Sequence, residues 1–531
     1  MNTAFEQLRQ ILGADNVAID AATLERYART TLLEGTRPCA VLYPRSTDEV
    51  KAAVHIAREH GIVLYPISRG KNWGYGDACA PTENAAILDL SRMNKIIEVN
   101  TELAYAIIEP GVSQQQLYEY LQAHDTGLWL DATGAGLDAS LVGNTLDRGF
   151  GHTRYGDHFL TACGMEVVLA DGRVLNTGFG HYPNAQAGRV YRYGVGPFLD
   201  GLFCQSNFGI VTQIGLWLMP KPEAFSFFFI KVDKDENLAP LIDRLRVMRL
   251  AGLLESAIHI GNDLRILSGT GRYPWKEANG VTPLPDDVLK SMRKANGIGA
   301  WNAGGSITGT KAHVKATITS LRKAVKGLGQ LILVNDQKLA LGQFVVRCLN
   351  RVGLGKAMAG QLEALVPNYG LLKGIPTNEP LTGAQWRLRT FCENISDPRD
   401  LGCGLIWASP VLPATGQHAT EVMSIVKPIF VQHGFETLVT FTLITERAMI
   451  AIINVVFDKA NAEESAAAER CYGALMDALI KKGYYPYRTA LPGMKKIHKS
   501  DDVFWQVASQ IKQALDPTDI IARGRYIPPT S

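Results

Sequence analysis

The stretch Pro66–Gly76, Pro-Ile-Ser-Arg-Gly-Lys-Asn-Trp-Gly-Tyr-Gly, contains the residue types that bind phosphate. Glycine allows positive φ and a close approach of the backbone, so consecutive N–H groups can form a concave nest for phosphate oxygens. Arg69 and Lys71 add positive charge, and Ser68 and Asn72 add neutral donors. The alternative is a tight turn between strands with solvated charges, and a glycine-rich loop alone does not decide between the two.

A second segment rich in small residues, Leu141–His152, has the composition of another backbone cradle, with a purely structural packing loop as the alternative. Further along, Asn207–Thr212 leads into an apolar strand that ends at Pro220. The sequence therefore predicts more than one place where backbone could approach a single ligand closely.

The elements before the first loop predict a βαβ unit. Ala40–Pro44 is typical of a short strand, and Ser46 or Thr47 can cap a helix whose apolar residues recur with helical spacing. A second strand, Gly61–Tyr65, then runs into the glycine-rich loop. This order predicts a small α/β subdomain that ends on the phosphate site.

Strands and turns continue beyond Ile87, including a helix after the cap Ser113 and a hairpin over Met165–Leu175 with Asp-Gly at its turn. We interpret residues 1–222 as two subdomains that clasp one elongated ligand. After Pro222, strands such as Met449–Phe457 alternate with helices such as Glu464–Lys481. An antiparallel sheet covered by helices on one face would accommodate this pattern.

Length and composition narrow the classes of function. With 531 residues the chain should form two or three units, and its net charge of +3 is too small to indicate nucleic-acid binding. The N-terminus lacks a secretory signal and no long apolar run predicts a membrane helix. The eight cysteines are scattered without Cys-x-x-Cys pairs, which favours reduced thiols, a cytoplasmic location and no structural metal.

The chain resembles the flavoprotein family typified by vanillyl-alcohol oxidase and the flavoprotein subunit of para-cresol methylhydroxylase. The resemblance covers most of the chain at both ends and lies in the glycine-rich loop and in these segments: Ile87–Leu90, Met93–Ile97, Glu109–Val112, Gly143–Thr145, Leu216–Pro222 and Gly483–Arg488. It implies an α+β fold with a two-subdomain FAD-binding domain (1–222), an α+β cap domain with an antiparallel sheet (223–490), and a C-terminal segment (491–531) that returns to the FAD-binding domain.

The resemblance also implies oxidation of a para-substituted phenol by hydride transfer from its benzylic carbon, giving a quinone methide. That route needs donors and a positive charge around the phenol oxygen in a dry site. In the family a loop tyrosine and a Tyr-Arg pair surround this oxygen, and Tyr75, Tyr487 and Arg488 match them. The alternative makes Tyr75 a packing residue and Arg488 a surface ion-pair partner.

Nineteen positions are assigned to FAD by the same resemblance. They are Pro44, Ile67, Ser68, Arg69, Gly70, Lys71, Asn72, Gly74, Gly76, Gly143, Asn144, Arg148, Gly151, His152, Gly156, Gly209, Ile210, Val211 and Arg525.

The chain also departs from the family. Relatives attach the flavin through a histidine or tyrosine in the region matching Ser396–Trp407, where this sequence has neither, so we expect FAD without a covalent link; His418 lies beyond the segment. His152 stands where relatives carry tyrosine, and the acid near the flavin in alcohol-oxidising relatives falls near Ala135, with Asp138 close by.

A strand that often carries Met-His-His and an acid reads Met449-Ile450-Ala451 with Asn454 here. The phenolate end of the site therefore looks kept and the end that receives water or base looks changed, so the quinone methide could be hydrated, trapped or deprotonated. Oxidation of a non-phenolic alcohol or 2-hydroxy acid, and a flavin subunit serving electron relay, are the alternatives. Oxygen or a separate cytochrome would accept the electrons, and the family suggests a homodimer.

Overall fold

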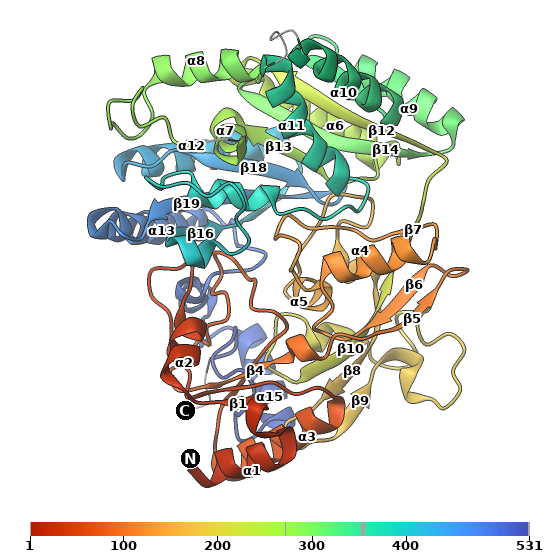
Figure 1. The fold of residues 1–531 in the computed structure, drawn as a ribbon, viewed down its shortest axis with the longest axis vertical. Helices are drawn as coiled ribbons and strands as arrows, with labels where there is room; N and C mark the ends of the chain where they lie inside the picture. Colours follow the sequence, from red (N-terminus) through yellow and green to blue (C-terminus); the bar gives the residue numbers. More distant parts are fainter. Residues whose placement is uncertain (1, 271, 352–355, 529–531) are drawn as a thin grey trace.

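The computed structural model describes residues 2–270, 272–351 and 356–528 (Figure 1). A small mixed sheet and a five-stranded antiparallel sheet occupy the lower half of the view, and a large antiparallel sheet with its helices occupies the upper half. Both ends of the chain lie at the bottom of the molecule.

The small sheet has the order β1-β2-β4-β3, with β2, β4 and β3 parallel. Its strands are β1 (Val17–Ala18), β2 (Ala40–Leu42), β3 (Leu64–Ile67) and β4 (Ala86–Asp89). Helix α3 (Thr47–His60) joins β2 to β3: the Ser46 hydroxyl accepts a hydrogen bond from the Glu49 N–H at its start, and Gly61 ends it with φ +65°. The predicted βαβ unit is therefore present, with α1 (Asn2–Leu12) packed on α3.

The five-stranded sheet has the order β5-β6-β10-β8-β9, and its paired strands are antiparallel. The strands are β5 (Ile96–Asn100), β6 (Tyr105–Ile108), β8 (Ala162–Val168), β9 (Val174–Asn176) and β10 (Ile210–Trp217). Strands β8 and β9 form the hairpin predicted at the Asp-Gly turn. Helices α4 (Gln114–Ala123), capped by Ser113, and α5 (Leu141–Leu146), capped by Ser140, precede β8 and lie beside this sheet.

The large sheet has the order β15-β12-β14-β13-β18-β19-β16, with β17 also paired to β19. Its strands are β12 (Ala224–Val232), β13 (Ile258–Asn262), β14 (Trp301–Gly309), β15 (Gln330–Val334), β16 (Cys403–Ala408), β17 (Val411–Pro413), β18 (Leu438–Leu443) and β19 (Ala448–Asp458). Its pairings are antiparallel, which confirms the predicted α+β fold with an antiparallel cap sheet.

Four helices cover one face of the large sheet: α6 (Leu238–Leu250), α9 (Lys311–Ala324), α12 (Gly416–Gln432) and α13 (Ala462–Lys481). Strand residues alternate between this helical face and the opposite one, as the two-residue period of a strand requires. In β13, for example, Ile258 and Ile260 pack in the helical core, whereas His259 and Gly261 face a cavity. The sheet thus presents to the candidate site the face opposite these four helices, and Leu339 and Tyr369 of the later helices α10 (Asp336–Arg351) and α11 (Lys356–Leu371) pack on part of that face.

The remaining helices are α2 (Ala21–Ala28), α7 (Asp263–Thr270), α8 (Asp286–Asn296), α10 (Asp336–Arg351), α11 (Lys356–Leu371), α14 (Met494–Ile497) and α15 (Val503–Leu515). After α15 the chain returns to the small sheet, where Ile521 pairs in parallel with Leu64 of β3. Lys512 is buried beneath this segment and bonds to the Asp516 carboxylate at 2.5 Å. The boundaries at 222 and 490 stay a prediction, since strand pairing does not itself define domains.

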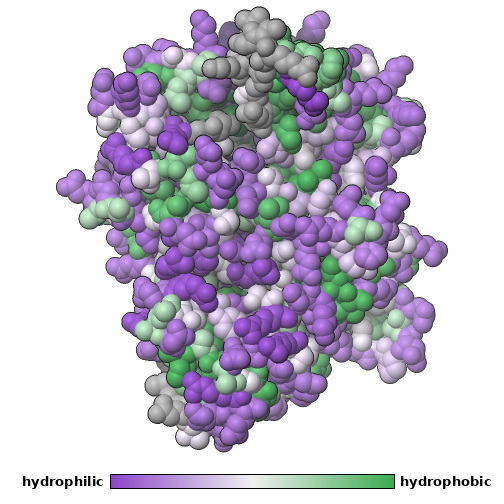
Figure 2. All heavy atoms as spheres, viewed as in Figure 1, coloured by the Kyte–Doolittle hydropathy of each residue, from purple (hydrophilic) through white to green (hydrophobic). Residues whose placement is uncertain are grey.

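The face shown in Figure 2 is mostly hydrophilic, with apolar side chains in separate small patches. Among the described helices, none combines the length and apolarity needed to cross a bilayer. The described residues likewise contain no group of three or more His, Cys, Asp or Glu side chains arranged to hold a metal ion.

Candidate active site

A cavity of about 2010 Å³ separates the two smaller sheets from the large one. Its walls come from the glycine-rich loop, from residues 139–152, from Gly209–Val211, and from the face of the large sheet opposite α6, α9, α12 and α13. Tyr487, Arg488 and Arg525 reach it from the C-terminal part of the chain. Segments that are hundreds of residues apart therefore share one binding space.

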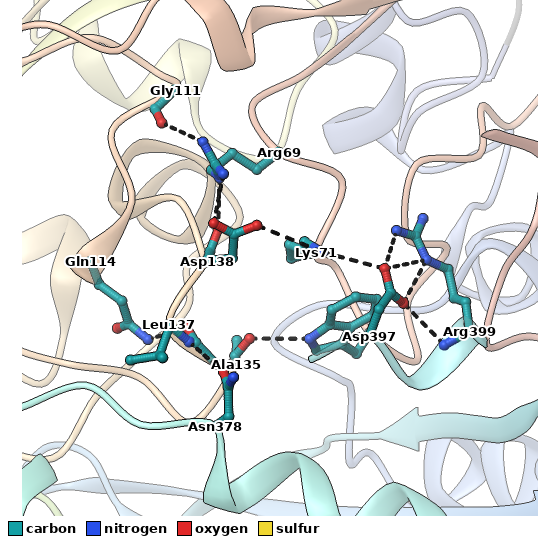
Figure 3. Close-up of polar contacts among 12 residues, drawn as sticks. Arg69, Lys71, Gly111, Gln114, Ala135, Leu137, Asp138, Asn378, Asp397 and Arg399 are labelled. Carbon is teal, nitrogen blue, oxygen red and sulfur yellow. Dashed lines mark hydrogen bonds and ion pairs between the residues drawn. The ribbon is translucent and has the colours of Figure 1, made fainter. Parts of the chain in front are cut away.

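Arg69 in the glycine-rich loop is fully engaged with protein groups. Its guanidinium forms a 2.6 Å ion pair with the Asp138 carboxylate and donates to the carbonyl oxygens of Asp138 and Gly111 (Figure 3). Because Asp138 balances its charge, Arg69 anchors the loop to the neighbouring segment.

Lys71 is balanced in the same way from the opposite side. Its ammonium lies 3.3 Å from a carboxylate oxygen of Asp397, which also receives bonds of 2.6 to 3.3 Å from Arg399 (Figure 3). Burial raises the pKa of Asp397, but the hydrogen bonds and charge of Arg399 outweigh burial and hold it below its ordinary value. The loop is thus tied to the chain that leads into β16.

The Arg69 and Lys71 side chains are paired with carboxylates, but backbone N–H groups of the same loop remain free to bind a ligand. Gly70 has φ +62°, and the N–H groups of Gly70, Lys71 and Asn72 donate to no acceptor within the described ranges. A Cβ on Gly143 would lie 3.1 Å from the Ser68 hydroxyl oxygen, so glycine at position 143 lets the two predicted cradles approach each other closely. This geometry is suited to hold an anion by backbone N–H groups.

Tyr75 is held at the opposite side of the loop by three contacts. Its hydroxyl lies 2.8 Å from the Ser409 hydroxyl, its ring stacks on Trp407 at 6.4 Å and 14°, and the Arg488 guanidinium lies 3.9 Å from its ring centre. Tyr75 is 2% exposed. Packing fixes the ring, so the position of its hydroxyl is determined before any ligand binds.

Arg488 is a buried cation rather than a surface one. It forms a 3.1 Å ion pair with Asp147, which also pairs with Arg525 at 2.9 Å, and it donates to the Asn72 side chain at 3.4 Å. Burial alone would lower the pKa of Arg488, but Tyr487, Tyr75 and Asp147 raise it well above its ordinary value. Its Nε–H is buried and has no acceptor among the residues that the structure describes.

Tyr487 lies beside Arg488, and its backbone N–H donates to the Ser409 carbonyl at 3.1 Å. Burial raises the pKa of Tyr487 well above its ordinary value, although the Arg488 charge opposes this effect. Tyr487 therefore keeps its proton near neutral pH and can donate it in a hydrogen bond. Tyr75, Tyr487 and Arg488 together form a donor group around one point of the cavity.

Two histidines line the cavity beyond this donor group. The rings of His152 and His259 are 4.6 Å apart, and burial lowers the pKa of both, most strongly for His259. The Nδ1 of His259 is 3.0 Å from the Thr442 hydroxyl, and its Nε2 is buried without a partner. Both rings are therefore neutral near pH 7. They add polar groups at the end of the site that receives water or base, where the sequence lacks the histidines and acid of relatives.

Most of the positions predicted to bind FAD line this cavity: Ile67, Ser68, Arg69, Gly70, Lys71, Asn72, Gly143, Asn144, His152, Gly209, Ile210, Val211 and Arg525. Pro44, Gly74, Gly76, Arg148, Gly151 and Gly156 are not part of its lining. Three of these glycines have a packing reason instead, because a Cβ would collide with Trp407 at Gly74, Leu491 at Gly76 and Asp131 at Gly151.

The structure also locates the residues at which this sequence differs from the family. Ala135 lines the cavity, whereas Asp138 is paired with Arg69 and does not. Asn454 of β19 lines it with a buried, unpartnered Oδ1, while Met449 and Ala451 point into the helical core. His418 of α12 lies 2.7 Å from the Tyr484 hydroxyl, away from the cavity.

Our sequence reasoning missed His259, Asp147 and Arg265, all of which line the cavity. His259 had a signal, because it is the polar residue between two apolar ones in a strand. Asp147 and Arg265 had none, since a charged residue in a loop or on a helix is most often solvated.

Comparison with known proteins agrees with this geometry. Residues 38–178 match the family described as FAD binding domain. The chain is 36% identical over 528 residues to 1'-carboxy-chondrochloren decarboxylase of Chondromyces crocatus, covering 99% of this chain and 97% of the relative. It is 32% identical over 528 residues to the 4-cresol dehydrogenase [hydroxylating] flavoprotein subunit of Pseudomonas putida, covering 99% and 95%.

Solved structures give the same result. A substrate-bound p-cresol methylhydroxylase crystal structure superposes with a TM-score of 0.89 at 30% identity, covering 99% of this chain and 97% of the other. The 4-ethylphenol oxidase of Gulosibacter chungangensis, in an isoeugenol complex, superposes with a TM-score of 0.90 at 28% identity and the same coverage. The free backbone donors of Gly70–Asn72 and the unpartnered cavity groups fit a bound flavin dinucleotide and its substrate. The chain belongs to the para-cresol methylhydroxylase family of FAD-dependent oxidoreductases.

Proposed function

We propose that this protein oxidises para-substituted phenols by removing a hydride from the benzylic carbon. The observation that carries the proposal is the donor group of Tyr75, Tyr487 and Arg488, which converge in a buried site around Ser409 and Asn72. Their hydroxyls and the Arg488 guanidinium supply the donors and positive charge that stabilise a phenolate. A phenolate pushes electrons through the ring, so loss of hydride leaves a neutral quinone methide.

In this proposal the loop backbone at Gly70–Asn72 and the Gly143 segment hold FAD, which supplies the acceptor for the hydride. Arg488 lowers the pKa of the substrate phenol because its charge favours the ionised form. The ion pair with Asp147 keeps Arg488 oriented. The same Asp147 carboxylate also pairs with Arg525. The phenol proton leaves before the hydride does, so the charge on the ring is neutralised during the step.

The fate of the quinone methide depends on the groups at the benzylic end. His152 and His259 are neutral, and burial makes them weak bases. Asn454 cannot take a proton, so addition of water or loss of a proton would occur without a strong protein base.

A second candidate outcome is loss of CO₂, which the name of the Chondromyces crocatus relative favours. If the carbon next to the benzylic carbon carries a carboxylate, its C–C bond can break after hydride removal. The bonding electrons then form the side-chain double bond and restore the phenolate, and CO₂ leaves. This route needs no base and no water, in keeping with the changed end of the site. Measuring CO₂ and 4-vinylphenol from 3-(4-hydroxyphenyl)propanoate tests it.

Other features of the proposal come from the family. We propose that FAD is held without a covalent bond, because the cavity-lining residues Pro398, Leu405 and Trp407 offer no nucleophile in the attachment region. Oxygen or a separate electron carrier would reoxidise the flavin, and the protein would act as a homodimer in the cytoplasm.

The test is anaerobic reduction of the bound flavin, followed by its absorbance, with 4-ethylphenol and its methyl ether. Reduction by the phenol alone supports the phenolate route. Reduction by both compounds would contradict it, because the ether cannot form a phenolate. Reduction by neither, together with reduction by a 2-hydroxy acid, would favour the non-phenolic alternative.

A further inference from the structure

Arg265 of α7 is a cavity-lining cation that has no acidic partner among the residues described by the structure. Its side chain is partly exposed, and its Nε–H is buried without an acceptor from those residues. Within the described ranges, its hydrogen bonds come only from its backbone, which bonds to the Asn262 and Ser268 side chains. The rest of its guanidinium is partly exposed toward the cavity, so Arg265 offers a positive charge and N–H donors to an anionic group of a ligand.

Other enclosed arginines in the described chain are compensated. Arg387 pairs with Glu436 at 2.7 Å and Glu464 at 2.6 Å, and Arg399 pairs with Asp397 at 2.6 Å. Arg249 has no carboxylate but donates to backbone carbonyl oxygens, including that of Ile444 at 3.1 Å. Within the part of the chain that the structure describes, Arg265 has neither kind of partner for its side chain, and desolvation lowers the pKa of its guanidinium.

Two glycines lie beside the Arg265 guanidinium. A Cβ on Gly383 would lie 3.5 Å from Nη1 of Arg265, and a Cβ on Gly269 would lie 3.7 Å from it. Both glycines also line the cavity. A ligand group could therefore reach the guanidinium from the cavity side.

Arg265 lines the same cavity as Tyr75, Tyr487 and Arg488. The Tyr487 ring is 5.8 Å from the Phe150 ring, which is 6.3 Å from the His259 ring. The positive charge of Arg265 acts in turn on His259 and contributes to lowering its pKa. Tyr487, Phe150 and His259 are thus joined by successive ring contacts, Arg265 is close enough to His259 for its charge to act on that ring, and Arg488 and Arg265 are two separate cationic groups of one cavity wall.

We propose that Arg265 binds a carboxylate on the para side chain of the phenolic substrate. The inference rests on the proposed phenol oxidation and names its substrate class: a para-substituted phenol whose side chain ends in an acid. Arg488 takes the phenol oxygen, the aromatic wall takes the ring and benzylic carbon, and Arg265 takes the acid through its planar fork of N–H donors.

The experiment compares 3-(4-hydroxyphenyl)propanoate with its methyl ester, which has the same phenol and side chain without the charge. For the wild-type holoenzyme, we expect the acid to reduce the flavin with a kcat/KM roughly 10- to 100-fold higher than the ester, the range of one charge-assisted hydrogen-bond pair. In Arg265→Met this ratio should fall to about 1. Arg265→Lys, which keeps the charge, should retain part of the preference.

The matched control is Arg347→Met. Arg347 of α10 also lines the cavity but is exposed, so its loss should leave the acid-to-ester ratio unchanged. A binding measurement independent of turnover uses 3-(4-methoxyphenyl)propanoate and its methyl ester as competitive inhibitors, with the same ratio expected for their inhibition constants. The ligand-free Arg265→Met protein should melt at or above the wild-type temperature, because an unpaired, partly buried charge is removed.

Equal reduction by acid and ester in the wild type would overturn the carboxylate subsite and leave phenol oxidation standing. An acid preference that survives Arg265→Met, or one that Arg347→Met also removes, would overturn the assignment to Arg265. If neither these compounds nor 4-ethylphenol reduces the flavin, the proposed function itself fails.

Discussion

Arg488 and Tyr75 illustrate how single residues in this site are set by their neighbours. The guanidinium lies over the Tyr75 ring and is balanced by Asp147, while the Tyr75 hydroxyl contacts Ser409. Such residues are held rigidly before substrate binds, which is the condition for electrostatic stabilisation of a charge that forms during reaction.

Replacing Tyr75 by phenylalanine should remove one donor to the phenolate with little change in packing. We expect kcat/KM for 4-ethylphenol to fall roughly 100-fold, the effect of losing one donor to a developing oxyanion. Steady-state kinetics with a fixed electron acceptor measure this. Tyr472→Phe is the control, since the Tyr472 hydroxyl contacts Thr489 at 3.3 Å outside the cavity. Equal losses in both variants would refute a specific role for Tyr75.

His259 should make stability depend on pH. Burial lowers its pKa, so the unfolded chain takes up a proton below pH 6.5 that the folded chain refuses. Stability from this group is therefore present above pH 6.5 and declines as the pH falls. Each pH unit costs at most about 1.4 kcal/mol until the folded-state pKa is reached.

In His259→Gln this contribution disappears. The loss of unfolding free energy between pH 7 and pH 5, from urea unfolding of the holoenzyme, should be about 1 to 2 kcal/mol smaller than in the wild type. His152 still contributes, because its pKa is lowered as well, so some acid sensitivity remains. An unchanged pH dependence would mean that His259 is protonated in the folded protein.

At the scale of elements, the glycine-rich loop is shaped by its contact with β16. Gly74 has φ +72°, and a Cβ there would lie 2.0 Å from the Trp407 ring. The Gly74 N–H donates to the Thr31 hydroxyl at 2.8 Å, and the Trp407 indole N–H donates to the Trp73 carbonyl at 2.8 Å. The loop therefore depends on the large sheet as well as on its own strand.

Gly74→Ala should lower the free energy of unfolding by more than the cost of placing alanine at a positive φ. Gly61→Ala is the matched control, because Gly61 has φ +65° but nothing within 4 Å of its Cβ position. We expect about 1 kcal/mol for Gly61→Ala and about 2 to 5 kcal/mol for Gly74→Ala, which adds overpacking against Trp407. Thermal unfolding and FAD content of the purified variants measure the difference. Similar losses would mean that Trp407 moves aside freely.

At the scale of the whole molecule, the cavity lies between units that are separate in sequence, and FAD should link them. Precipitation of the purified protein with acid should release the yellow colour into the supernatant, because no nucleophile in the attachment region faces the cavity. Colour that stays with the precipitate would show a covalent bond.

The protein freed of FAD should also melt at a lower temperature than the holoenzyme. A ligand present at 1,000 times its dissociation constant stabilises the folded state by about 4 kcal/mol. Restoring FAD should restore the melting temperature, and a melting temperature that FAD leaves unchanged would contradict binding between the units.

Neighbouring residues in the sequence were sufficient to predict several helices and turns. The Ser46 and Ser113 caps, the Asp-Gly hairpin and the helix predicted at Glu464–Lys481 follow from residues within a few positions of one another, and each is present. The family, the FAD cofactor and the α+β class also follow from motifs in the chain. These features depend on backbone preferences and short spacings that the order of residues specifies directly.

Which charged residues of the site are paired with an opposite charge depends on tertiary contacts, and the order of residues does not specify these contacts. Arg69 and Lys71 resembled free phosphate ligands, yet folding brings Asp138 and Asp397 against them and leaves the phosphate site to the backbone. Arg265 resembled an ordinary helix residue, yet the tertiary structure places it in the cavity wall with no acidic partner among the described residues. Whether a charge is compensated is decided by residues up to 378 positions away, as in the pair of Arg525 with Asp147, because electrostatic pairing acts through space and not along the chain.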